Sequence, residues 1–171
     1  MKRILVAGIG NIFLGDDAFG SEVARELMAI ALPPEAHVVD FGIRGYDLAY
    51  ALADGYDAVI LVDATPRNEP PGTVCLIEPD LANLGSLESA SVDAHDMVPL
   101  HVLQMAEALG GRPARLFLVG CEPDQLDSED GQMGLSDAAQ AAVPKAVEMV
   151  QSLIKELSQT ERNKDTGAVP A

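Results

Sequence analysis

The sequence has few residues of the kinds that bind nucleic acid. Its 171 residues include no tryptophan, three tyrosines and four phenylalanines, and 11 basic side chains stand against 27 acidic ones, for a formal net charge of −16. A surface this acidic repels phosphate backbones, and the aromatic rings on which bases stack are scarce. The composition excludes nucleic acid as a main partner and favours a cationic metal, a basic peptide or a specific protein surface.

Long apolar runs and clustered cysteines are also missing. The apolar run that begins at Ile4 is interrupted at Gly8 and ends at Gly10, well short of the roughly 18 apolar residues that a membrane-spanning helix needs. The two cysteines, Cys75 and Cys121, are far apart in the sequence and indicate neither a disulfide framework nor a zinc site. We therefore expect a cytoplasmic enzyme or binding protein without a membrane segment.

Short apolar runs alternate with helical patterns along the chain. Strands are predicted at 3–7, 37–40, 58–63, 73–78 and 115–119, and helices at 18–32, 46–53, 97–109 and 137–157. This alternation predicts an α/β fold, a three-layer sandwich in which a twisted, mostly parallel five-stranded sheet has helices on both faces. The link before the strand at 73–78 is too short for a helical crossover, so that strand is expected to be antiparallel or at an edge.

The same patterns divide the chain into a domain and a tail. Residues 1–157 are expected to form a single α/β domain, because no linker interrupts them. Ser136 is expected to cap the last helix at its N-terminus. From Ser158 onward the residues are mostly polar and show no apolar period, which predicts a disordered tail over 158–171.

Polar residues gather where the predicted strands end. Asp16 and Asp17 follow the first strand, Asp40 and Asp63 end the second and third, and His95 precedes the helix at 97–109. In sheets of this kind, ligands bind at the carboxyl ends of the strands. Asp63 follows five apolar residues, and a lone carboxylate in such a place costs several kcal/mol unless it has donors, a cation or a metal as partner.

Each of these residues also has a structural interpretation. An aspartate after a strand often caps the next helix or holds a turn, and Asp16 is expected to have such a role because it faces a different direction from Asp17. For His95, a metal-binding role and an ordinary loop position are both open. Cys121 follows the fifth strand, but no histidine is placed to activate it, so we expect a structural thiol and not a nucleophile.

The familiar motifs of other enzyme classes are missing or incomplete. Gly8-Ile9-Gly10 begins like the dinucleotide loop G-x-G-x-x-G, but Phe13 occupies the third glycine position and Asp16-Asp17 would repel a pyrophosphate. The sequence contains no G-x-S-x-G, H-E-x-x-H or Walker loop, which disfavours a serine hydrolase, a zincin and a P-loop NTPase.

A spaced set of glycines and polar residues runs from Gly8 to His95: Gly8-x-Gly10-Asn11-x-x-x-x-Asp16-Asp17-x-x-Gly20, then Asp40-x-Gly42, Asp63 and His95. This set resembles the [NiFe]-hydrogenase maturation endopeptidases, and the similarity extends over most of the chain. The resemblance implies that Asp17, Asp63 and His95 bind the metal. It further implies removal of a C-terminal extension from the hydrogenase large-subunit precursor, with substrate-borne nickel as the recognition element.

The sequence alone leaves other roles and other functions open. Asp40, expected at the same edge of the sheet, is a candidate for a supporting base or for a residue that orients its neighbours. A monomer is expected for a chain that processes a large partner. The alternatives are a metal- or nucleotide-binding α/β module without peptidase activity, and a hydrolase of small molecules, each using the same edge.

Overall fold

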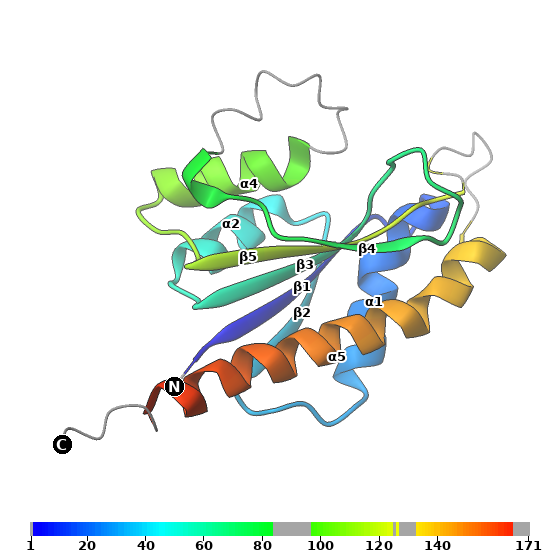
Figure 1. Ribbon diagram of the computed structural model, residues 1–171. Coiled ribbons are helices and arrows are strands. Elements are labelled where there is room, and N and C mark those ends of the chain that lie inside the picture. Colours follow the sequence, from blue (N-terminus) through cyan, green and yellow to red (C-terminus); the bar gives the residue numbers. More distant parts are fainter. Residues whose placement is uncertain (1, 84–96, 125, 127–132, 166–171) are drawn as a thin grey trace.

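The computed structural model describes residues 2–83, 97–124, 126 and 133–165. Within them a five-stranded sheet lies between two layers of helices, which confirms the predicted α/β sandwich (Figure 1). The strands are β1 (Ile4–Ile9), β2 (Ala36–Gly42), β3 (Ala58–Ala64), β4 (Val74–Ile77) and β5 (Arg115–Cys121). The helices are α1 (Phe19–Met28), α2 (Gly45–Ala53), α4 (Met97–Ala108) and α5 (Asp137–Asp165), with short 3-10 helices η1 (Gly15–Ala18) and η2 (Leu81–Asn83).

The strand order is β2-β1-β3-β5-β4. The first four of these strands are parallel, and β4 pairs antiparallel with β5 at the edge, as the short link before it predicts. Helices α1 and α5 cover one face of the sheet, while α2 and α4 cover the other (Figure 1). Every residue of β3 is buried, because this central strand has a helical layer on each side.

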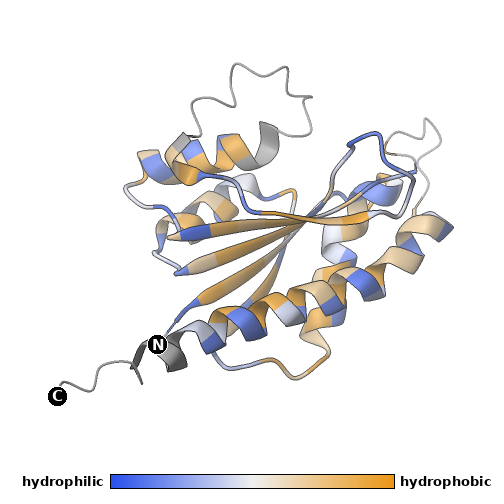
Figure 2. Ribbon diagram, viewed as in Figure 1, coloured by the Kyte–Doolittle hydropathy of each residue, from blue (hydrophilic) through white to orange (hydrophobic). Residues whose placement is uncertain are grey.

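Alternate residues of the strands form two separate apolar cores. Val6 and Ile60 pack with Phe19 on the side of α1 and α5, whereas Leu5 and Leu61 pack toward α2 and α4. Figure 2 shows the apolar residues concentrated in the strands between the two helical layers. Because neighbouring residues of a strand face opposite layers, Val62 belongs to the first core, and Asp63, the next residue, points toward the face covered by α2 and α4.

Two glycines let α1 pack unusually close to the sheet. A Cβ atom at Gly20, in the first turn of α1, would lie 2.1 Å from the Val62 carbonyl oxygen and 2.2 Å from that of Ile9. A Cβ at Gly8 would lie 2.5 Å from the Gly20 carbonyl oxygen. The beginning of α1 is therefore in direct contact with the ends of β1 and β3, and η1, which precedes it, is held beside β3.

The last helix begins as predicted but ends later. The backbone N–H of Ala139 donates to the Ser136 hydroxyl at 3.2 Å, which confirms Ser136 as its cap. The prediction of a tail from Ser158 is wrong for its first part, because α5 continues to Asp165. Four of the eight residues in that stretch, Gln159, Glu161, Arg162 and Lys164, are good helix formers. The rest of the predicted tail, 166–171, lies outside the described residues. Among those described, no helix is both long and apolar enough to span a membrane.

Candidate functional site

The candidate site lies where the strand order reverses. The chain passes from β1 to β2 on one side of the sheet and then crosses to β3 on the other side of β1. The loops after β1 and β3 therefore diverge to opposite sides, and the crevice between them is the usual ligand site of open α/β sheets. Asp17 comes from the first of these loops and Asp63 from the end of β3.

The loop after β1 folds back so that its own backbone holds Asp17. The backbone N–H of Asn11 donates to the Asp17 carboxylate at 2.9 Å. Gly10 has a φ of +149°, and a Cβ atom there would lie 1.8 Å from the Asp17 carbonyl oxygen. The second glycine of the G-x-G sequence thus accommodates the chain's own backbone.

Asp63 is a buried carboxyl close to a second one. Its residue is 9% exposed. Burial raises the pKa of Asp63 well above its ordinary value, the nearby charge of Asp17 raises it further, and a hydrogen bond from the Ala64 backbone opposes both effects. Asp17 therefore lies near enough to Asp63 for their charges to interact, and η1, which carries Asp17, is in contact with β3. Two carboxylates in a partly dry space repel each other, and a divalent cation between them would relieve that repulsion.

The third predicted metal ligand, His95, lies outside the described residues. The part of the chain that the structure describes contains no group of three or more histidine, cysteine, aspartate or glutamate side chains arranged around a common point. Helix α4, which follows His95 in the sequence, begins at Met97 and packs against α2. The role of His95 accordingly stays a prediction.

Asp16 has the structural role expected of it, but through distant partners. Its residue is only 2% exposed. One carboxylate oxygen accepts the Ser136 backbone N–H at 2.7 Å, and the other accepts the Ser136 hydroxyl and the Asp124 N–H, both at 2.8 Å. It does not cap α1, because the N-terminus of that helix has no side-chain cap. The carboxylate instead fastens η1 to the segments that precede α5.

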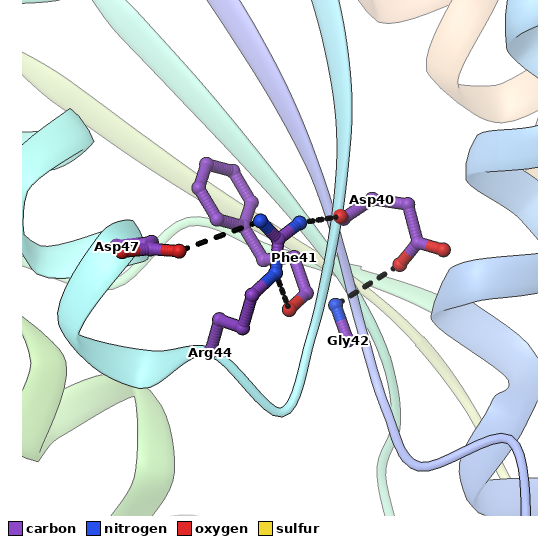
Figure 3. Close-up of polar contacts among 5 residues, drawn as sticks. All are labelled: Asp40, Phe41, Gly42, Arg44 and Asp47. Atoms are coloured by element: carbon purple, nitrogen blue, oxygen red, sulfur yellow. Dashed lines mark hydrogen bonds and ion pairs between the residues drawn. The ribbon is translucent and has the colours of Figure 1, made fainter.

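Asp40 holds the turn after β2. Its Oδ1 accepts the Ser21 hydroxyl at 2.7 Å and the Gly42 backbone N–H at 3.0 Å, the latter drawn in Figure 3. The second bond closes an Asx turn, in which Gly42 adopts a φ of +55°. Ser21, a buried residue of the first turn of α1, was not identified from the sequence; its position directly after Gly20 was the available signal.

The thiol of Cys121 is buried and electrostatically unsuited to nucleophilic attack. Burial is the main cause that raises its pKa to about 12, and the neighbouring acidic groups Asp16, Cys75 and Glu122 add to the shift. At neutral pH the group is therefore a neutral thiol within the core. This agrees with the structural role predicted from the sequence.

The chain is similar to proteins that process hydrogenases. The model of the family described as hydrogenase maturation protease matches residues 21–153. The Hydrogenase 2 maturation protease of Escherichia coli is 30% identical over 156 residues, which cover 90% of this chain and 92% of that protein. The solved structure of the E. coli hydrogenase maturating endopeptidase HybD matches with a TM-score of 0.75 and 29% identity, covering 90% of this chain and 93% of that one.

An archaeal structure extends the similarity. The [NiFe] hydrogenase maturation protease HybD from Thermococcus kodakarensis matches with a TM-score of 0.70 and 26% identity, covering 89% of this chain and 99% of that one. The family match, over residues 21–153, covers most of the chain. The chain belongs to the hydrogenase maturation protease family.

Proposed function

We propose that this protein is an endopeptidase that removes a C-terminal extension from the nickel-loaded large-subunit precursor of an [NiFe]-hydrogenase. The observation that supports the proposal is the position of Asp17, in η1, beside the end of β3, which carries Asp63, at the point where the strand order reverses. Membership of a protease family favours this function over a metal- or nucleotide-binding module without peptidase activity.

Nickel enters this proposal as part of the substrate. Carboxylate oxygens and an imidazole nitrogen are suitable ligands for Ni²⁺, and three such ligands leave coordination positions open. If the precursor's own cysteines hold the metal, Asp17, Asp63 and His95 would complete its coordination and so hold the precursor with the bond to be cleaved nearby. A precursor without nickel would lack this anchor and would bind poorly.

The test is cleavage of a purified precursor with and without nickel, followed by mass spectrometry. We expect the wild-type protein to shorten the loaded precursor only. The Asp17→Asn, Asp63→Asn and His95→Gln variants should each lower the rate at least about 100-fold. Asp54→Asn removes an exposed carboxylate that pairs with Arg3 and serves as the matched control. Equal cleavage of loaded and unloaded precursor would contradict a recognition role for nickel.

In this proposal Asp40 orients the turn, because its Oδ1 accepts hydrogen bonds from Ser21 and Gly42. An asparagine keeps an oxygen that can accept these bonds but cannot take up a proton at neutral pH. We therefore expect Asp40→Asn to keep cleavage within about threefold of wild type, and Asp40→Ala to lose much more. If Asp40 acted as a general base, both variants would lose at least about 100-fold, and the pH profile of the rate would lose its acidic limb.

A further inference from the structure

A groove of about 350 Å³ lies between the loops that follow β1 and β2. Asn11, Ile12 and Phe13 line it from the first loop, and Phe41, Ile43 and Arg44 line it from the second. We propose that this groove, which we call the β1–β2 groove, binds an apolar side chain of the precursor within a few residues of the cleaved bond. The inference rests on the proposed function and adds to it the site that selects the peptide.

The lining of the groove is apolar and exposed to an unusual degree. Ile43 is 77% exposed, Phe13 60% and Ile12 48%. Side chains of this size normally gain about 1.5–3 kcal/mol each when they are buried, so leaving three of them at one groove is costly unless a partner covers them. Gathered apolar residues of this kind mark binding surfaces more often than isolated ones do.

The walls of the groove are fixed by hydrogen bonds before any ligand arrives. The Gly10 N–H donates to the Gly42 carbonyl oxygen at 3.0 Å, which joins the two loops directly. The Phe13 N–H donates to the Asn11 side chain at 3.0 Å, and the Asp40–Gly42 turn holds the other wall. A groove already in its binding shape loses little entropy when a peptide enters it.

Arg44 is occupied within its own loop. Its guanidinium donates to the carbonyl oxygens of Asp40 and Phe41, lies 3.4 Å from the Asp47 carboxylate, and has its central carbon 6.0 Å from the centre of the Phe41 ring (Figure 3). Its positive charge therefore stabilises the turn. Because Asp40 also lines the groove and the chain is strongly acidic, an apolar side chain fits the groove better than an acidic one.

The groove adjoins the carboxylate pair. Asn11 is one of the residues that line the groove, and its backbone N–H donates to the Asp17 carboxylate. An extended peptide advances about 3.3 Å per residue, so a segment with one part at Asp17 reaches the groove within a few residues. This continuity identifies the occupant as the segment next to the cleaved bond.

Kinetics on the nickel-loaded precursor test the proposal. We expect Phe13→Ser and Ile43→Ser each to raise KM about tenfold, and the double variant to raise it further, with kcat changed less than about threefold. Met28→Ser is the matched control, because Met28 is 52% exposed in the last turn of α1, and it should leave both constants unchanged. Unchanged KM in the double variant would overturn the groove assignment while the proposed function stands.

Photo-crosslinking keeps the two proposals separable. A photoreactive p-benzoylphenylalanine at position 43 should crosslink to the precursor within a few residues of the cleavage point, and one at position 28 should not. Absence of cleavage by the wild type would contradict the proposed function itself, whereas cleavage without a crosslink from position 43 to the precursor would overturn the groove assignment alone. A crosslink from position 43 to a second copy of this chain, with none to the precursor, would overturn the groove assignment and mark a self-association surface.

Discussion

Replacement of Gly20 by alanine is expected to destabilise the protein strongly. The added Cβ would meet the carbonyl oxygens of Val62 and Ile9 and the N–H of Ile9, at 2.1, 2.2 and 2.6 Å, and these are backbone atoms of two buried strands. No side-chain rotation can relieve such contacts, so α1 must move away from the sheet. We expect the free energy of unfolding to fall by about 4 kcal/mol or more, which exceeds the usual cost of an overpacked core.

Thermal unfolding followed by circular dichroism measures this effect. For a chain of this length the midpoint should fall by on the order of 10 °C. Gly45→Ala is the control, because Gly45 begins α2 with no atom within 4 Å of its Cβ position, and alanine there should be neutral or slightly stabilising. A Gly20→Ala protein that melts within about 2 °C of wild type would show that the close packing of α1 is not required.

Asp63→Asn is expected to abolish cleavage and yet to stabilise the fold. Burial and the charge of Asp17 raise the pKa of Asp63, so folding works against the ionised form of this carboxyl group. A neutral amide of similar size removes that penalty, as expected where function opposes stability. We expect a free energy of unfolding about 1 kcal/mol or more above wild type at neutral pH.

The gain in stability should depend on pH with a definite sign. A raised pKa means that the folded protein binds the proton of Asp63 more tightly than the unfolded chain does. Ionisation of Asp63 therefore destabilises the fold, and this cost is fully present once the pH exceeds the pKa of the folded state. The difference between Asp63→Asn and wild type should therefore be small near about pH 4 and should grow as pH rises. Urea unfolding at several pH values measures it, with Asp54→Asn as control. A constant difference across that range would contradict the assignment.

Much of the fold could be predicted because its signals are local. The apolar run from Ala58 to Asp63 predicts the central strand, and the short link before Thr73 predicts the antiparallel edge strand. The Asp17–Asp63 pair could also be predicted, since both residues follow strands whose ends meet at one edge of the sheet. The end of α5 could not, because beyond Leu157 no apolar period indicates whether the polar residues continue the helix.

The interactions that the sequence did not reveal are long-range ones. Asp16 was expected to act near its own position, but its partners Asp124 and Ser136 are more than 100 residues away along the chain. The β1–β2 groove depends on two loops that come together only when β1 and β2 pair. Its apolar residues Phe13 and Ile43 lie in loops, so they belong to no helical or strand period that would identify them in the sequence.

The link between Asp16 and Ser136 has a consequence for the order in which the protein matures during its synthesis. The loop that carries Asp17 belongs to the first part of the chain to leave the ribosome, but its fastening at Asp16 requires Ser136, which emerges last among the parts that complete the site. A nascent chain that lacks Ser136 cannot form these bonds, so we expect the loop that carries Asp17 to become ordered only when nearly the whole chain has been made.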